Sequence, residues 1–191
     1  QKNIFLIEDN SHAHGATVNS QKTGSFGIIS VGSLHQRKSL PVGDGGIICT
    51  NNKEIYSKIY KLRSFGHEEL SYNYRMTEFA GAIGQVRLKK LIIENETRIL
   101  YAKRLAKIID QSPYLEVIMP KESNKSVFYA LLIKINSKTS KFNKEILELE
   151  KNNIPIRFTW KPLHKHSHFS PDQEIARGNP WDHSKYKEFN P

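Results

Sequence analysis

Apolar residues in the first fifty positions come in short runs, separated by polar residues and glycines. One run covers residues 3–7 and ends at Glu8 and Asp9, and two more cover residues 26–31 and 46–50. A short apolar run without alternation is typical of a strand that is covered on both faces. The pattern therefore predicts three strands, joined by a polar loop over residues 10–24 and by a glycine-rich linker that starts at residue 32.

The middle of the chain changes to a helical period. Apolar residues at helical spacing predict a helix within residues 52–65. Thr77 is a good capping residue for a second helix over about residues 78–93. A third amphipathic stretch covers residues 97–109 and ends shortly before Pro113, which cannot continue a helix.

Strand patterns return in the last third of the chain. We expect strands over residues 114–119, 127–135 and 154–159, with a helix over residues 141–152 between the last two. From residue 164 onward the chain is rich in His, Pro, Gly and Asn without a period, which is typical of a loop. Strands and helices in this order indicate an α+β domain that follows an α/β region.

The charge balance changes this picture little. The 191 residues contain 29 Lys and Arg against 19 Asp and Glu, which gives a net charge of +10. Basic and acidic residues are interleaved and no arginine-rich arm is present, so we expect no nucleic-acid partner, and the basic surface favours anionic small ligands.

No apolar run approaches the roughly 18 residues that span a membrane, so we expect no membrane association. The single cysteine, Cys49, fits a reducing compartment and a cytoplasmic location.

Three polar residues stand where chemistry is expected. Asp9 ends a predicted strand, and the ends of strands are where open α/β sheets bind ligands. Ser33 and Lys38 lie in the glycine-rich linker. Taken singly, each has a simpler interpretation, as a surface carboxylate, a loop hydroxyl and a solvated lysine. Together they match the needs of pyridoxal phosphate, which requires a lysine amine for its aldehyde, an acid for its pyridine nitrogen, and hydroxyl or N–H donors for its phosphate.

The histidines offer an alternative, because imidazole is a common metal ligand. The spacing of His12, His14 and His35 matches no zinc pattern. The alternating His164, His166 and His168 have no cysteine or carboxylate at ligand spacing. The sequence therefore predicts no metal site.

Four stretches of the chain resemble motifs of the DegT/DnrJ/EryC1/StrS sugar aminotransferases, in the same order as in that family. Residues 7–16 (IEDNSHAHGA) are similar to its strand-end motif, and residues 32–46 (GSLHQRKSLPVGDGG) to its lysine segment and glycine-rich turn. Residues 72–91 (YNYRMTEFAGAIGQVRLKKL) resemble its tyrosine–asparagine–tyrosine–arginine–methionine motif with the helix that follows. Residues 154–166 (IPIRFTWKPLHKH) resemble a segment near the substrate entrance.

The resemblance implies a role for individual residues. Lys38 becomes the Schiff-base lysine and Asp9 the partner of the pyridinium nitrogen, so these two are the expected catalytic residues. His12 is expected beside the cofactor ring and Ser33 on its phosphate. Asn73 is expected to reach across a homodimer interface to the partner's cofactor phosphate.

The resemblance also implies a fold and a reaction. The fold expected is an α/β aspartate-aminotransferase fold (fold type I), with residues 1–105 as the carboxyl-terminal part of the large cofactor-binding domain. Residues 106–191 are expected to form an incomplete small α+β domain. The reaction implied is amino transfer from glutamate or glutamine to a nucleotide-linked keto sugar, in the biosynthesis of amino sugars or surface polysaccharide. His164 is expected at the substrate entrance. Family members that dehydrate sugars carry histidine at the lysine position, so Lys38 favours the aminotransferase branch.

Two portions of the family pattern have no counterpart in these residues. One is the amino-terminal portion, which carries a phosphate loop and a ring-stacking aromatic residue, and the other is the end of the small domain. We therefore expect a fragment that binds the cofactor weakly by itself. An alternative of another class is a catalytically silent fragment, or a basic binding module that retains the fold.

Overall fold

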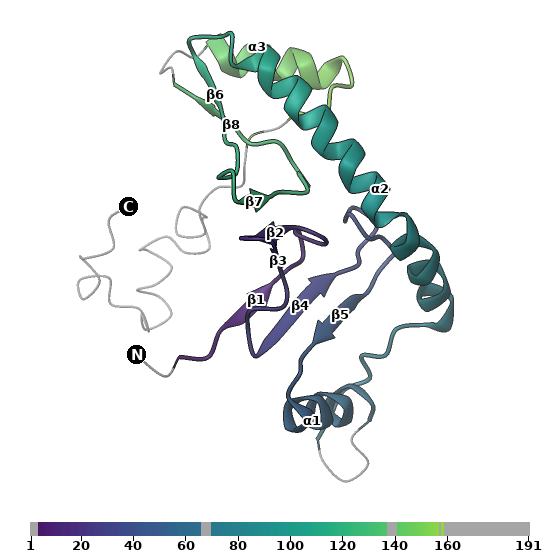
Figure 1. The fold of residues 1–191 in the computed structure, drawn as a ribbon. Helices are drawn as coiled ribbons and strands as arrows, with labels where there is room; N and C mark the ends of the chain where they lie inside the picture. The colour runs from purple at the N-terminus through teal and green to yellow at the C-terminus, as the bar shows by residue number, and fades with distance from the viewer. Residues whose placement is uncertain (1–3, 66–69, 137–140, 157, 159–191) are drawn as a thin grey trace, which may run out of the picture. The chain divides into compact units, whose positions relative to one another are not determined.

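The computed structural model describes residues 4–65, 70–136, 141–156 and 158 (Figure 1). The chain divides into two compact units, residues 1–137 and 138–191. The first unit holds all the strands among the described residues and two of the helices, and the second holds helix α3 (Lys141–Lys151). Among the described residues, no helix is both long and apolar enough to span a membrane.

The three strands predicted at the start of the chain form one sheet in the order β1-β4-β5 (Figure 1). Strand β1 (Ile7–Asp9) pairs in parallel with β4 (Ile29–Ser33), and β4 pairs antiparallel with β5 (Gly46–Cys49). All three predictions of a strand are confirmed, but β1 covers residues 7–9 rather than 3–7 and β4 begins at Ile29 rather than at residue 26. The reason is that the backbone N–H groups of Phe26 and Gly27 donate to the carboxylate of Glu8 instead of to a strand.

A small hairpin lies within residues 10–24, which the sequence predicted as loop. Strands β2 (Thr17–Val18) and β3 (Gln21–Lys22) pair antiparallel around Asn19 and Ser20, whose φ angles are 48° and 67°. Positive φ at both central residues is the geometry of the tight hairpin turn. Strand β7 (Asn124–Lys125) pairs with the other side of β2, so a segment far along the sequence joins the amino-terminal loop.

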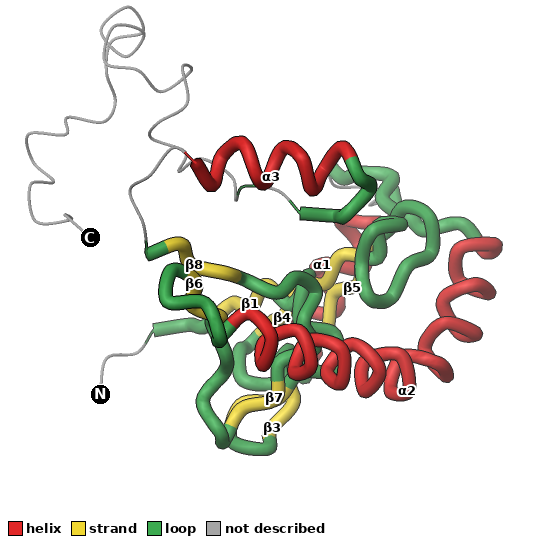
Figure 2. The backbone as a smooth tube through the Cα atoms, turned by 90° about the horizontal axis from the view of Figure 1, so that it is seen from above, coloured by secondary structure: helices red, strands yellow, loops and turns green. Residues whose placement is uncertain are grey.

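Helix α1 (Lys53–Arg63) confirms the predicted helix, and Asn52 caps it by accepting the N–H groups of residues 54 and 55. The next two predicted helices are one continuous helix, α2 (Glu78–Ile109), which is 32 residues long and extends across the view in Figure 2. A helix of that length measures about 48 Å. The two stretches merge because residues 94–97 contain no glycine or proline, and because Glu94 pairs with Arg87 and Arg98 across that region.

The strands of the last third are shorter than expected. Strand β6 (Leu115–Val117) pairs antiparallel with β8 (Ile133–Ile135), while residues 127–132 are irregular. Helix α3 confirms the predicted helix of residues 141–152, but residues 154–156 and 158 are not strand. The expected α+β domain over residues 106–191 and its boundary at residue 105 stay predictions.

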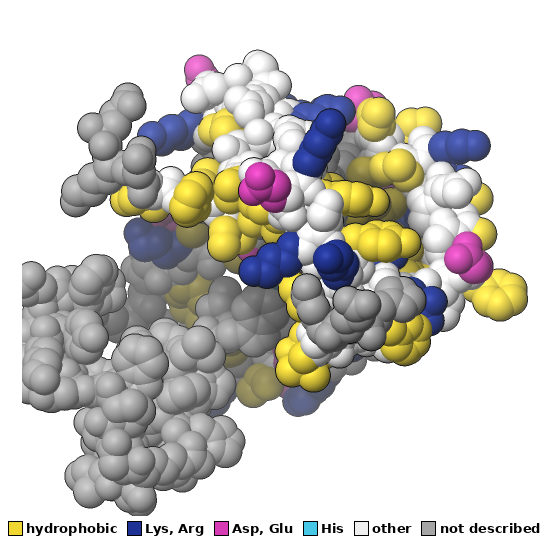
Figure 3. Space-filling model, turned by 90° about the horizontal axis from the view of Figure 1, so that it is seen from below, with side chains coloured by type: hydrophobic (Ala, Val, Ile, Leu, Met, Phe, Trp, Pro, Cys, Tyr) yellow, Lys and Arg dark blue, Asp and Glu magenta, His cyan; other side chains and the backbone are white. Residues whose placement is uncertain are grey.

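The buried core of the first unit is small. Leu34, Val42 and Ala80 form its main cluster, with Leu40 packed against it. Strand β1 and the residues before it are largely exposed: the exposed fractions of Phe5 and Ile7 are 79% and 67%. Hydrophobic side chains also reach the surface among lysines and arginines in the space-filling view of Figure 3.

Cys49 is exposed, although a cysteine in an apolar strand is usually a buried thiol. The reason is that all four residues of β5 are exposed in this chain.

Candidate active site

Two of the predicted site residues lie at the same edge of the sheet. Asp9 ends β1 and Ser33 ends β4, and these strands are parallel, so their carboxyl ends point the same way. The backbone extends the pairing by one step, because the N–H of Asn10 donates to the carbonyl of Val31 at 2.7 Å. This edge is where open α/β sheets place their ligands.

The carboxylate of Asp9 is exposed and held in its ionised form. Its Oδ1 accepts the backbone N–H of Ser11 at 3.0 Å. Hydrogen bonds from the side chain and backbone of Ser11 lower the pKa of Asp9, and the charges of His12 and Lys38 lower it further. Asp9, His12 and Lys38 therefore lie close enough for the charges of His12 and Lys38 to change the pKa of Asp9.

Lys38 and His12 are in direct contact. The Lys38 Nζ atom lies 2.5 Å from Nε2 of His12, which bridges the linker after β4 and the loop after β1. Burial lowers the pKa of His12, and the positive charge of Lys38 lowers it further. A neutral imidazole can accept a hydrogen bond from an ammonium group, so the two groups form a donor–acceptor pair.

Tyr129 completes this cluster, although no motif of the sequence pointed to it. Its ring stacks on the imidazole of His12, with the ring centroids 4.0 Å apart and the planes at 4°. The Lys38 Nζ atom lies 5.2 Å from the centroid of the same tyrosine ring. The residue lies in a segment predicted as strand, and only the pairing of β7 with β2 brings that segment to the site.

The other polar residue of the linker, Ser33, is fixed on two sides. Its hydroxyl oxygen accepts the backbone N–H of His35 at 3.3 Å, which leaves the hydroxyl hydrogen to be donated. Its carbonyl oxygen accepts Nε2 of His14 at 2.8 Å. His14 is 6% exposed, and its own carbonyl accepts Nδ2 of Asn95 on α2 at 2.9 Å. One partly buried and one buried hydrogen bond therefore join the end of β4 and the loop after β1 to the long helix.

Asn73 lies apart from this cluster. It forms an isolated bridge with Ser64, and its Oδ1 accepts Nε of Arg75 at 3.2 Å. In the described part of the chain, no hydrogen bond joins Asn73 to Asp9, Ser33 or Lys38. Separation within one chain is compatible with the predicted role of Asn73 toward a partner subunit and does not test it.

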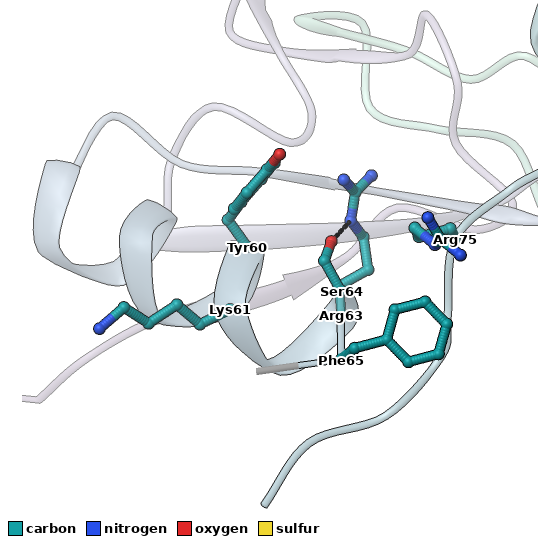
Figure 4. A pocket seen from close by; sticks show the side chains of 6 residues that line it. All are labelled: Tyr60, Lys61, Arg63, Ser64, Phe65 and Arg75. Atoms are coloured by element: carbon teal, nitrogen blue, oxygen red, sulfur yellow. Dashed lines mark hydrogen bonds between the residues drawn. The ribbon is translucent and has the colours of Figure 1, made fainter. Parts of the chain in front are cut away.

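A hollow of about 440 Å³ lies beside Asn73 at the end of α1 (Figure 4). The guanidinium of Arg75 lies 4.5 Å from the ring centroid of Phe65, and that of Arg63 lies 5.1 Å from the ring centroid of Tyr60. Its lining residues are Tyr60, Lys61, Arg63, Ser64, Phe65 and Arg75. The hollow is cationic and carries none of the predicted catalytic residues.

His164 lies outside the described residues, so its place at a substrate entrance stays a prediction. Among the residues that the structure describes, no group of three or more His, Cys, Asp or Glu side chains is arranged to hold a metal ion.

The fold and the cluster of lysine, histidine and carboxylate place the chain among proteins with the aminotransferase fold. The structure of an aminotransferase from Streptoalloteichus hindustanus superposes with a TM-score of 0.79 at 23% identity, over 91% of this chain and 51% of that one. Helicobacter pylori PseC, an aminotransferase involved in pseudoaminic acid biosynthesis, superposes with a TM-score of 0.77 at 27% identity, over 95% of this chain and 51% of that one.

The chain belongs to the DegT/DnrJ/EryC1/StrS aminotransferase family, whose sequence model matches residues 1–183. It is 33% identical over 178 residues to the UDP-4-amino-4,6-dideoxy-N-acetyl-beta-L-altrosamine transaminase of Campylobacter jejuni, covering 87% of this chain and 47% of that enzyme. It is 30% identical over 173 residues to the GDP-perosamine synthase of Escherichia coli O157:H7, covering 85% and 46%. The chain thus spans about half the length of these curated relatives.

Proposed function

We propose that this chain carries the lysine half of a pyridoxal-phosphate-dependent aminotransferase, which moves an amino group from glutamate or glutamine to a nucleotide-linked keto sugar. The observation that carries the proposal is the contact between Lys38 and His12 beside Asp9, in a chain of this family. The relatives found are named for enzymatic activities on nucleotide sugars, so a purely structural or binding role receives no support from them.

The donor set fits the cofactor. An amine (Lys38), a carboxylate that stays ionised (Asp9) and a hydroxyl with a hydrogen to donate (Ser33) come from two neighbouring strand ends and the linker that follows them. These are the groups required by the aldehyde, the pyridine nitrogen and the phosphate. When bound, the cofactor supplies an electron sink for the carbon that loses its proton.

The residues of the chain then divide the remaining work. Lys38 would hold the cofactor through its aldehyde group and would carry the proton to and from the reacting carbon of the substrate. Asp9 would keep the pyridine nitrogen protonated, because its lowered pKa leaves it anionic at neutral pH. His12 accepts a hydrogen bond from the lysine in the resting site and thereby holds the amine at the cofactor position.

Further features of the proposal rest on the family resemblance. Asn73 would donate to the cofactor phosphate of a partner subunit in a homodimer, and its exposed position near a cationic hollow supports this. His164 would line the sugar entrance. Residues 1–105 would belong to the large domain and residues 106–191 to the small one, in a cytoplasmic enzyme.

The proposal is tested with the protein as its gene encodes it, supplied with pyridoxal phosphate, an amino donor and UDP- or GDP-linked 4-keto sugars. We expect an aminated sugar, detected by mass spectrometry, with glutamate or glutamine as donor. Lys38→Ala should reduce the rate by about 10²–10⁴-fold, the range for loss of a proton-transfer group. Lys103→Ala, which changes an exposed lysine on α2, serves as the matched control. A dehydrated sugar without amine, or full activity in Lys38→Ala, would contradict the proposal.

A further inference from the structure

The segment that carries Tyr129 is held against the amino-terminal loop by several independent contacts. Strand β7 pairs with β2, and the side chain of Asn124 accepts the backbone N–H of Asn19 at 3.2 Å. Val127, which follows β7, has an exposed fraction of only 2%. The backbone before Tyr129 is thus anchored by pairing and by burial.

A strained backbone residue then directs Tyr129 to the site. Phe128 has a φ of 47°, in the left-handed region that side chains other than glycine rarely adopt, and its N–H donates to the hydroxyl of Ser126 at 3.1 Å. Such conformations persist only where their surroundings hold them, and they are concentrated at functional sites. The residue directly after this turn is Tyr129, stacked on His12.

The contact geometry is specific on both sides of the histidine. One face of the His12 imidazole lies parallel to the Tyr129 ring, and its Nε2 meets the Lys38 amine. A flat imidazole stacked at 4.0 Å has little freedom to rotate, so the direction of Nε2 is fixed as well. The ammonium of Lys38 also lies within cation–π reach of the tyrosine face, at 5.2 Å.

We propose that Tyr129 is a positioning residue of the active site, which fixes the His12 ring and through it the direction from which Lys38 meets the cofactor aldehyde. The role toward the cofactor rests on the proposed function, whereas the stacking on His12 does not. Both contacts of Tyr129 with the site are made by its aromatic ring, and among the described residues no hydrogen bond joins its hydroxyl to His12 or Lys38.

The test compares Tyr129→Leu and Tyr129→Phe with the unchanged chain and with Tyr101→Leu, which changes an exposed tyrosine on α2. The first measurement is the proton NMR spectrum of the histidines, assigned with His12→Gln. Ring-current shifts of the His12 protons should be present in the unchanged chain, Tyr129→Phe and Tyr101→Leu, and lost in Tyr129→Leu. Equal His12 shifts in all variants would overturn the stacking.

The second measurement is the pyridoxal phosphate concentration that half-labels Lys38, after borohydride reduction and peptide mass spectrometry. Tyr129→Leu should need about 2- to 10-fold more cofactor, which corresponds to the loss of one aromatic pair. Tyr129→Phe should need the same cofactor concentration as the unchanged chain, because it keeps the aromatic ring. A role that depends on the hydroxyl would not predict this result. Labelling of Lys38 that is equal in Tyr129→Leu would overturn the positioning role and leave the proposed function intact. Absence of Lys38 labelling in the unchanged chain and in the protein as its gene encodes it would instead contradict the proposed function.

Discussion

Nε2 of His14 lies 2.8 Å from the carbonyl oxygen of Ser33, so the loop after β1 and the end of β4 are joined by a partly buried hydrogen bond. A carbonyl oxygen only accepts, and Nε2 must therefore carry the hydrogen. The bond requires close approach of the imidazole to the backbone of β4, and Gly32 provides the space. A Cβ atom at Gly32 would lie 2.7 Å from Cε1 of His14 and 3.1 Å from Cγ2 of Ile47.

Gly32→Ala should therefore destabilise the chain by about 1–3 kcal/mol, the usual cost of overpacking a well-packed site. The matched control is Gly81→Ala in helix α2, where an added Cβ meets nothing within 4 Å and alanine favours the helix. Urea unfolding measures both changes. If Gly32→Ala is as stable as the unchanged chain, the His14 ring can move away from the added Cβ without a loss of stability, which would contradict the prediction.

Asn95 is the second support of the same loop. It is 4% exposed, donates to the carbonyl of His14 at 2.9 Å and accepts NH1 of Arg98 at 2.6 Å. Asn95→Ala leaves that carbonyl without its donor in a buried place, so we expect a loss of about 1–3 kcal/mol in the free energy of unfolding. Glu96→Ala, an exposed change at the next position of the helix, should stay within about 0.5 kcal/mol. Similar unfolding midpoints for the two variants would contradict the role of Asn95.

Glu8 organises the chain before β4. Its carboxylate accepts the backbone N–H groups of Gly24, Phe26 and Gly27 at 2.7, 2.7 and 2.8 Å. The N–H of Gly27 contributes most to lowering the pKa of Glu8 below 4.5, and those of Gly24 and Phe26 add to it. A carboxyl with a lowered pKa in the folded state stabilises the fold at pH values above 4.5, and this stabilisation is lost as the pH falls through the folded pKa.

Thermal unfolding of the unchanged chain should accordingly show a melting temperature that falls as the pH drops below 4.5. Glu8→Gln should melt lower at neutral pH, since an amide offers one oxygen to three N–H donors, and its melting temperature should depend less on pH in the acid range. Glu54→Gln, at an exposed position of α1, is the control. A pH dependence that survives unchanged in Glu8→Gln would contradict the prediction.

The His12 imidazole gives a prediction at mildly acidic pH. Burial lowers the pKa of His12 below 6.5, and the charge of Lys38 lowers it further. Lys38→Gln removes only the second cause, so the pKa of His12 should rise and remain below 6.5, as followed by NMR titration. Because the pKa of His12 is lower in the folded state, its contribution to stability is complete above pH 6.5 and is lost as the pH falls below 6.5 and through the lowered pKa of the folded state. An identical titration of His12 in Lys38→Gln would show that the Lys38 amine does not lie next to the His12 imidazole.

How far the sequence predicted this structure depends on the range of the interactions. A strand at the start of the chain, the strand at residues 46–49 and the helix within residues 52–65 follow from local pattern and were predicted, although the first strand covers residues 7–9 instead of 3–7. The division of α2 into two helices was wrong, because the polar residues between the two amphipathic stretches make ion pairs that favour continuity. The β2–β3 hairpin was missed, because two-residue strands are too short to show a period.

The candidate site divides in the same way. Asp9, His12, Ser33 and Lys38 were found because they stand in contiguous motifs, and the structure brings Asp9, His12 and Lys38 together. Tyr129 was missed because its contact with His12 depends on long-range strand pairing and on a left-handed residue, neither of which local pattern reports. Asn95, in the middle of a helix, was missed for the same reason, because its role depends on a hydrogen bond to the distant carbonyl of His14.

The most direct measurement for the central claim is the location of the covalent adduct when the protein as its gene encodes it is saturated with pyridoxal phosphate and reduced with borohydride. Peptide mass spectrometry should find the adduct at Lys38, and Asp9→Ala should weaken cofactor binding without moving the adduct to another lysine. An adduct at a different lysine, or one spread evenly over the lysines of the chain, would contradict the assignment of Lys38 and with it the proposed mechanism.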